Sequence, residues 1–99
     1  MPFVYILKSL KNQRFYIGYT TQSVEERLIE HNEGKFENCF SMRDRPWDIF
    51  HAIYCENVDI AKKIEQHIKN MKSRKYIHNL KEFPEIEVKL IDMYSAADS

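Results

Sequence analysis

The chain has 99 residues, in which 15 basic and 15 acidic side chains give a formal net charge of zero. This length suits one compact domain and leaves no room for a second core, while an apolar content of 43% excludes a disordered chain. A neutral balance lacks the basic excess typical of nucleic-acid-binding domains, so total charge alone argues against that class.

The first twenty residues are predicted to form a β-hairpin. Two short runs rich in β-branched and aromatic residues, 3–7 and 14–19, flank a polar connector. If Tyr5 pairs opposite Tyr16, the two phenols lie side by side on one surface. Gly18 shares a face with Tyr16 and leaves room for close approach of a ligand or a second backbone. The hairpin alone favours two core tyrosines over a functional site.

A helix is predicted over residues 24–33. Ser23 and Glu26 have the S-x-x-E form of a capping box, and Gly34 is a natural C-terminal stop. The stretch that follows, residues 32–46, is polar and irregular and is predicted to be a loop.

The apolar face of this helix has two polar residues at its edge. Val24 and Leu28 face the core, and helical spacing puts Arg27 and His31 one turn apart along the margin of that face. Spacing alone favours structural roles for both. The stem of Arg27 would cover the edge of the core, and His31 would be a cation at the helix C-terminus.

A third strand is predicted over residues 47–55. Apolar residues occur on both of its faces, which favours a central, covered strand. Strict alternation places Ile49, His51 and Ile53 on one face and Phe50, Ala52 and Tyr54 on the other. His51 is interpreted as a packed or surface histidine rather than a ligand.

A second helix is predicted to begin at Asn57 or Asp59 and to end at about Met71. Its buried stripe has helical spacing and consists of Ile60, Ile64, Ile68 and Met71. Glu65 lies at the margin of that stripe, where the simple interpretation is a solvated carboxylate in i,i+4 contact with Lys69.

The C-terminal part is predicted to hold a short helix over residues 73–80, ended by Pro84, and then a weak strand. The alternation that suggests this strand is Ile86, Val88 and Leu90. Residues 95–99 are expected to be frayed. We therefore predict one domain over residues 1–83 and a C-terminal extension over residues 84–99.

The charges are unevenly distributed along the chain. Between residues 60 and 81, Glu65 is the only acid among seven basic residues, which are Lys62, Lys63, Lys69, Lys72, Arg74, Lys75 and Lys81. This segment is predicted to form a basic surface that could bind nucleic acid despite the neutral total charge.

Two cysteines, Cys39 and Cys55, lie far apart without a C-x-x-C pair, which is typical of a reducing compartment rather than a disulfide scaffold. No apolar run is long enough for a signal peptide or a transmembrane span. We therefore expect a soluble, cytoplasmic protein without a membrane partner. The histidines and cysteines also lack the spacing of a zinc site.

Several short motifs, each weak alone, follow one another along the chain. They are Val4-Tyr5-Ile6, Tyr16-Ile17-Gly18-Tyr19-Thr20, Arg27-x-x-x-His31-Asn32-x-Gly34, Arg45-Pro46-Trp47 and Ala61-x-x-x-Glu65. This series resembles the GIY-YIG nuclease family over residues 3–75, and most closely its small stand-alone bacterial members, which are excinuclease-like in their catalytic domain. The resemblance implies an α+β fold in which helices flank a small three-stranded antiparallel sheet. That fold agrees with the β-β-α-β-α-α order predicted above.

The resemblance also implies a catalytic set. Tyr5 and Tyr16 match the two motif tyrosines. Arg27 matches the family's helix arginine, and His31 matches a position often held by a further active-site histidine. Glu65 matches the carboxylate that binds a single divalent metal ion, Mg²⁺ or Mn²⁺.

These residue types suit phosphodiester hydrolysis. An arginine fork such as that of Arg27 clamps a phosphate, and a single carboxylate can hold Mg²⁺ that keeps most of its waters. Tyr5 is predicted to accept the proton of the attacking water, while Tyr16 orients the water or the phosphate. Covalent attack by a tyrosine stays open as an alternative.

The chain departs from the family pattern in places. The first motif lacks its opening glycine. The polar loop residue that many members place near the phosphate has Ser41 as its nearest candidate and Arg43 as the next. The late supporting asparagine has Asn79 and Asn70 as candidates, and Gly18 is a further supporting residue. The predicted nucleic-acid-binding residues are Ser41, Arg43, Lys69, Lys72, Arg74 and Lys75.

The predicted function is that of a metal-dependent endonuclease that hydrolyses DNA. Branched, flapped or damaged DNA is the expected substrate class, and repair or recombination is the expected setting. Two alternatives stay open: a nucleic-acid-binding module without turnover, and a nuclease component whose partner protein supplies substrate recognition. The sequence leaves the oligomeric state undefined.

Overall fold

Three antiparallel strands, β1 (Phe3–Ser9), β2 (Phe15–Thr20) and β3 (Trp47–Tyr54), form one sheet in the order β2-β1-β3. The structure, a computed structural model, describes residues 2–34 and 43–96. Its helices are α1 (Val24–Asn32), α3 (Val58–Met71), α4 (Arg74–Glu82) and α5 (Pro84–Ala96). The predicted α+β class with a small three-stranded antiparallel sheet is confirmed.

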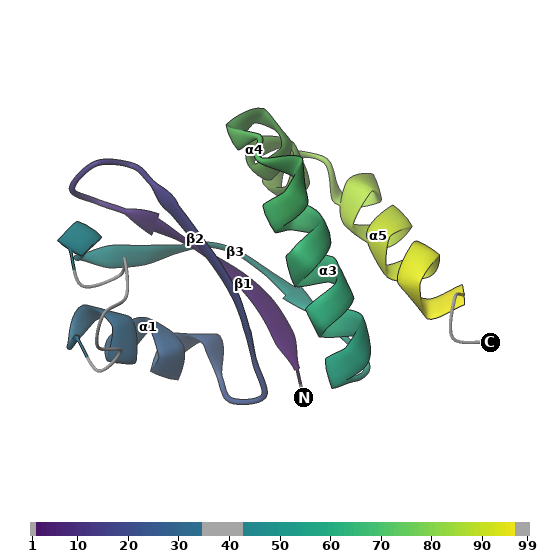
Figure 1. The fold of residues 1–99 in the computed structure, drawn as a ribbon, viewed down its shortest axis with the longest axis horizontal. Helices are drawn as coiled ribbons and strands as arrows, with labels where there is room; N and C mark the ends of the chain where they lie inside the picture. Colours follow the sequence, from purple (N-terminus) through teal and green to yellow (C-terminus); the bar gives the residue numbers. More distant parts are fainter. Residues whose placement is uncertain (1, 35–42, 97–99) are drawn as a thin grey trace.

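The helices cover both faces of the sheet. Figure 1 shows α1 on one side and α3, α4 and α5 on the other. Side chains of β1 alternate between the two layers: Val4 and Ile6 pack with the isoleucines of α3, whereas Tyr5 and Leu7 pack with Val24 of α1. The polar chemistry of Tyr5 therefore belongs to the α1 side.

The central strand is β1, so the prediction that residues 47–55 form the central strand is wrong. β3 pairs with β1 alone and lies at an edge. Its apolar residues on both faces follow from the double helical cover, because an edge strand between two packed layers is buried on both sides as well.

The register of the hairpin differs from the prediction by two residues. Tyr5 pairs with Gly18, and Tyr16 pairs with Leu7. β1 continues to Ser9, whose N–H donates to the carbonyl of Arg14 at 2.8 Å, so the turn closes farther along the chain than the sequence suggests. A shift of two residues preserves the faces, and Tyr5 and Tyr16 still lie on one side.

A β-bulge interrupts the pairing of β1 with β3. Ile6 pairs with His51 and Leu7 with Ile49, which leaves Phe50 as the extra residue. The predicted strict alternation is therefore wrong at this point. Ile49 packs on the α1 side, and Phe50 packs on the side of α4, where its ring lies 5.0 Å from that of Phe15 and 5.2 Å from that of His78.

The helix caps follow the sequence signals. Ser23 Oγ accepts the N–H of Glu26 at 3.1 Å at the start of α1. Asn57 Oδ1 accepts the N–H of Ile60 at 2.9 Å, which settles the choice between Asn57 and Asp59 as the cap of α3. The buried stripe of α3 ends at Ile68. Met71 is 45% exposed, contrary to the prediction, because α3 ends there and the chain turns away into α4.

The last segment is a helix, so the predicted strand around Ile86, Val88 and Leu90 is wrong. Ile86, Leu90 and Tyr94 recur at intervals of four residues and pack against the core, whereas Val88 is 56% exposed. Pro84 opens α5 at a first-turn position that tolerates proline. Residues 95 and 96 continue the helix, and 97–99 lie outside the described residues.

α5 packs against the helical layer rather than extending from it. His67 Nδ1 of α3 lies 2.8 Å from Tyr94 Oη, and His51 Nε2 of β3 lies 2.7 Å from Glu87 Oε1. The latter contact agrees with the interpretation of His51 as a packed histidine. Within residues 2–34 and 43–96, none of the helices has the length and apolarity to cross a membrane.

Candidate active site

A tyrosine and a histidine are in contact between the sheet and α1. Tyr5 is 1% exposed, His31 is 0% exposed, and Tyr5 Oη lies 3.1 Å from His31 Nε2. β1 aims Tyr5 at α1, and the last turn of α1 places His31 above it. The fold therefore brings together two of the predicted site residues, one from each element.

Tyr16 completes an aromatic cluster with these two side chains. Its ring stacks beside Tyr5 at a centroid distance of 6.3 Å and lies 4.5 Å from the ring of His31. Unlike Tyr5, Tyr16 is only partly buried and lines a cavity of about 440 Å³ together with Trp47 and Lys69. Tyr5 is thus the inner phenol of the pair, and Tyr16 is the phenol at the cavity.

The environment of His31 favours a neutral imidazole. Burial, assisted by the nearby Arg27 cation and opposed by Glu30, lowers the pKa of His31 from 6.5 to about 4. The interpretation of His31 as a helix C-terminal cation is therefore wrong. A neutral ring has one donor and one acceptor nitrogen, so Nε2 and the Tyr5 hydroxyl form a hydrogen bond between uncharged groups at neutral pH.

Because of His31, the free energy of unfolding is expected to decrease as the pH is lowered. Its pKa is lower in the folded state, so the unfolded chain binds the extra proton between pH 6.5 and about 4. The contribution is present above pH 6.5 and is lost as the pH falls toward 4, with a loss of about 2 kcal/mol at pH 5. Urea unfolding at pH 7 and pH 5 measures this difference. His31→Gln is expected to be less stable but to lose less stability between the two pH values, and equal losses would contradict the assignment.

Arg27 lies beside this cluster on the same helix. Its Nη1 lies 3.3 Å from Glu30 Oε1, and the side chain lines a second cavity of about 450 Å³ with Tyr19, Thr20 and Gln22. The two cavities occupy opposite ends of β2, one with Tyr16 and one with Arg27. The exposed edge of β2 therefore connects the predicted tyrosine and the predicted arginine.

Glu65 lies on α3, on the other side of the sheet, and is paired with a lysine that lines the cavity of Tyr16. Its carboxylate lies 3.0 Å from Lys69 Nζ, and its side chain is 15% exposed. The predicted i,i+4 contact with Lys69 is therefore confirmed, whereas the predicted solvation of this carboxylate is wrong, because most of the side chain is buried. Lys69 in turn lines the cavity of Tyr16, so α3 contributes this ion pair at the margin of the cavity.

The donor set fits one particular mode of metal binding. Within the described residues no three His, Cys, Asp or Glu side chains gather as a potential cage. Mg²⁺ commonly keeps several waters and binds through one or two carboxylates plus substrate phosphates. A lone, partly buried Glu65 suits that mode and does not suit a closed protein site.

Gly18 allows Tyr5 to lie against β2. A Cβ atom at Gly18 would come within 2.7 Å of Tyr5 Oη and 2.8 Å of its Cζ, closer than side chains tolerate. The predicted close approach at this glycine is made neither by a ligand nor by a second backbone but by the side chain of Tyr5.

Replacing Gly18 with Ala is expected to push the Tyr5 ring out of its position and to destabilise the fold by about 1–3 kcal/mol. Denaturant unfolding of the single variants and of Gly18→Ala with Tyr5→Leu forms a double-mutant cycle. Leu lacks the ring atoms that clash, so the cost of Gly18→Ala is expected to shrink in that background. An equal cost in both backgrounds would contradict the contact.

Sequence reasoning missed Asn32 as a structural residue of the site. Its side chain accepts the N–H of Trp47 at 2.6 Å and donates to the carbonyl of Trp47 at 3.1 Å, which fastens the end of α1 to the start of β3. Asn32 directly follows His31 in the motif that begins at Arg27, and this adjacency was the available signal.

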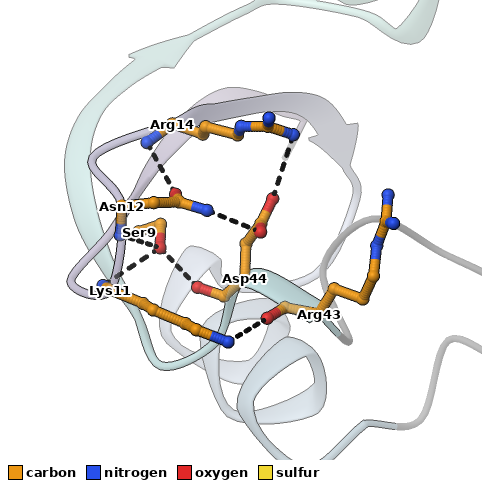
Figure 2. Close-up of polar contacts among 6 residues, drawn as sticks. All are labelled: Ser9, Lys11, Asn12, Arg14, Arg43 and Asp44. Carbon is orange, nitrogen blue, oxygen red and sulfur yellow. Dashed lines mark hydrogen bonds and ion pairs between the residues drawn. The ribbon is translucent and has the colours of Figure 1, made fainter.

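Sequence reasoning also missed a set of polar contacts that joins the hairpin turn to Asp44, which we call the clasp. Figure 2 shows Ser9, Asn12 and Arg14 facing Asp44, while the Arg43 guanidinium points away. Ser9 Oγ donates to the Asp44 carbonyl, and Asn12 Nδ2 donates to Asp44 Oδ1 at 2.7 Å. Asp44 is buried, and its signal in the sequence is only that of one acid in a polar loop. The clasp holds the turn next to the cavity of Tyr16, which Arg14 and Asp44 also line.

The remaining predicted residues are spread more widely. Ser41 and Cys39 lie outside the described residues, and Arg43 is exposed with its carbonyl accepting from Lys11 Nζ at 3.3 Å. Lys75 is exposed on α4, and Asn79 is partly buried there with its carbonyl accepting the N–H of Phe83. Lys69, Lys72 and Arg74 line one further cavity, described below.

A small α+β domain that packs two tyrosines, a histidine and an arginine on one side of its sheet has the fold and the residue types that the resemblance to GIY-YIG nucleases implies. The family model of the GIY-YIG catalytic domain matches residues 1–81. The chain therefore belongs to the GIY-YIG family, whose catalytic domain is that of a nuclease. A UPF0213 protein of Syntrophus aciditrophicus (strain SB) is 31% identical over 83 residues, which are 84% of this chain and 93% of that protein. No solved structure gives a significant match.

Proposed function

We propose that this protein is a metal-dependent DNA endonuclease that uses Tyr16, Arg27 and Glu65 at the edge of β2. The observation that supports this proposal most directly is that the family's residue types, or their direct partners, lie along that edge. Tyr16 and Lys69 line one cavity there, Arg27 lines the next, and Glu65 is paired with Lys69. DNA is the substrate on which nucleases of this family act.

Each side chain has a distinct task in the proposed hydrolysis. Arg27 binds a non-bridging oxygen of the scissile phosphate through its planar, permanently charged guanidinium. Tyr16, at the cavity, orients the attacking water, and its phenolate form, which the cation of Arg27 and a bound metal ion would favour, takes the proton of that water. Glu65 holds the divalent ion. When bound, that ion supplies charge stabilisation to the phosphate and lowers the pKa of a water.

In this proposal Tyr5 and His31 pack against the ring of Tyr16 and fix its position. Burial of Tyr5 keeps its phenol from the cavity, which favours Tyr16 over Tyr5 for the proton-accepting role assigned from the sequence. Neutral His31 packs against both rings and holds the hydroxyl of Tyr5. The pair therefore positions Tyr16 without adding a positive charge near the phosphate.

The test is a cleavage panel with purified protein. Single-stranded, duplex, flap and four-way-junction DNA are incubated with Mg²⁺, with Mn²⁺ or with a chelator, and nicks are located on labelled strands. We expect metal-dependent nicking, with flap or branched DNA cut faster than duplex, as suits a role in repair or recombination. Salt-sensitive DNA binding without cleavage of any substrate would instead favour a binding module or a nuclease component that needs a partner protein.

A further inference from the structure

A third cavity, distinct from that of Arg27, continues from the cavity of Tyr16 along β2 toward α4. It has a volume of about 280 Å³ and shares with the first cavity the lining residues Arg14, Phe15, Ile17 and Lys69. Its other wall consists of Lys72, Ser73 and Arg74 at the junction of α3 and α4. The shared residues make the two cavities one groove, which passes from the α1 side of the sheet over the edge of β2.

The turn between α3 and α4 gathers the cations of this groove. Lys72 caps α3 in a left-handed conformation with φ of 48°, and Ser73 Oγ then caps α4 by accepting the N–H of Tyr76 at 3.1 Å. This short connection places Lys69, Lys72 and Arg74 along one wall. Arg14 of the hairpin supplies a fourth cation from the opposite wall.

The positive charge of the groove is only partly compensated. Lys69 pairs with Glu65 at 3.0 Å, and Arg14 lies 4.0 Å from Asp44. Within residues 2–34 and 43–96, neither Lys72 nor Arg74 contacts a carboxylate. Two uncompensated cations therefore lie next to the candidate active site.

Aromatic rings contact Arg74 and two further cations without neutralising their charge. The Arg74 guanidinium lies 4.8 Å from the centre of the Phe15 ring, and Lys81 Nζ lies 4.6 Å from the centre of the Phe50 ring. Lys8 Nζ lies 5.7 Å from the same Phe50 ring. The bulge that turns Phe50 toward α4 thus extends the row of oriented cations beyond the groove.

We propose that the groove formed by Arg14, Lys69, Lys72 and Arg74 binds the phosphodiester backbone of the nucleic acid that flanks the scissile bond. The identity of the ligand rests on the proposed function. A row of cations that spans two joined cavities suits a chain of phosphates better than one small anion, and an arginine held against an aromatic ring presents a preformed fork to a phosphate. Arg14 and Arg74 on opposite walls contact the backbone from two sides.

The test is the salt dependence of binding to labelled single-stranded and duplex DNA of one sequence, measured with a chelator so that no cleavage occurs. Lys72→Gln with Arg74→Gln is compared with Lys63→Gln with Lys89→Gln, which removes the same charge. Lys63 belongs to the basic segment 60–81 but lines a separate cavity between α3 and α5, which shares no residue with the groove, and Lys89 is exposed on α5. The groove variant is expected to lower the slope of log K against log salt by about 1.5 and to bind at least roughly tenfold more weakly, while the control keeps the wild-type slope.

The outcomes separate this proposal from the nuclease assignment. Weaker binding of either DNA by the groove variant but not by the control variant supports the proposal. The DNA whose binding is weakened more, single-stranded or duplex, is the form that the groove binds. Equal losses in both double variants, or no salt-dependent binding by the wild-type protein, would overturn it. If binding behaves as expected but no substrate is cleaved, the proposed function alone fails. Phe15→Leu is expected to weaken DNA binding, though less than Arg74→Gln does, whereas Phe15→Tyr, which keeps an aromatic ring, is expected to bind DNA like the wild type.

Discussion

Replacing Tyr16 with Phe is expected to lower the rate of DNA cleavage by about 10²–10⁴-fold while leaving the fold intact. Proton transfer by a positioned side chain contributes on this order to hydrolytic rates. The phenylalanine ring preserves the stacking on Tyr5 and the contact with His31, so the loss reports the hydroxyl rather than the packing. Single-turnover cleavage with Mg²⁺, together with unfolding curves, measures both quantities.

Tyr5→Phe is the matched comparison, because it removes the same atom from the inner phenol. The Tyr5 hydroxyl is buried against His31 Nε2. Its loss is expected to destabilise the fold by about 1–3 kcal/mol and to lower the cleavage rate less than Tyr16→Phe does. A wild-type rate in Tyr16→Phe combined with an inactive Tyr5→Phe would return the proton-accepting role to Tyr5, as the sequence alone predicts.

The sequence analysis was correct for features that depend only on residues close together in the chain. Ser23 and Asn57 cap helices because their side chains satisfy N–H groups within three residues, a contact that depends on neighbouring sequence alone. The spacing of Ile60, Ile64 and Ile68 marks a buried helical face in the same way. The hairpin was predictable too, since its strands and connector are adjacent in sequence.

The errors occur where two arrangements satisfy the same pattern. A shift of two residues leaves every side chain of the hairpin on its face, so alternation cannot distinguish Tyr5 opposite Tyr16 from Tyr5 opposite Gly18. The residues Ile86, Val88 and Leu90 alternate as in a strand, yet the wider spacing of Ile86, Leu90 and Tyr94 is helical. A bulge such as that at Phe50 has no signal in the pattern, because it depends on pairing with a distant strand.

The site was predictable in residue type but not in geometry. Motif spacing brought Tyr5, Tyr16, Arg27 and His31 into one set. It could not show that Tyr5 is buried while Tyr16 faces a cavity, or that burial lowers the pKa of His31. These properties arise from the layer that α1 forms on the sheet. Which of the two tyrosines faces the cavity therefore depends on tertiary packing and cannot be predicted from the motif.

Replacing Glu65 with Gln is expected to lower metal-dependent cleavage by at least about 100-fold, because a metal ion contributes several kcal/mol of charge stabilisation to such reactions and each 1.4 kcal/mol is about tenfold in rate. Glutamine keeps the size of the side chain and removes only the charge that would hold the ion. Cleavage across a Mg²⁺ titration measures the effect. Glu25→Gln, at an exposed position in the first turn of α1, is the control with the same change in charge and is expected to cleave like the wild type.

Direct Mn²⁺ binding separates a metal ligand from a merely structural carboxylate. Calorimetry or electron paramagnetic resonance is expected to show weaker Mn²⁺ binding in Glu65→Gln and tighter binding in Lys69→Met, because Lys69 Nζ lies 3.0 Å from the carboxylate and repels a cation there. If the ion pair of Glu65 and Lys69 is merely structural, both variants lose stability and neither changes the affinity for Mn²⁺. Opposite shifts in Mn²⁺ affinity from the two partners of one salt bridge would therefore identify Glu65 as the metal ligand.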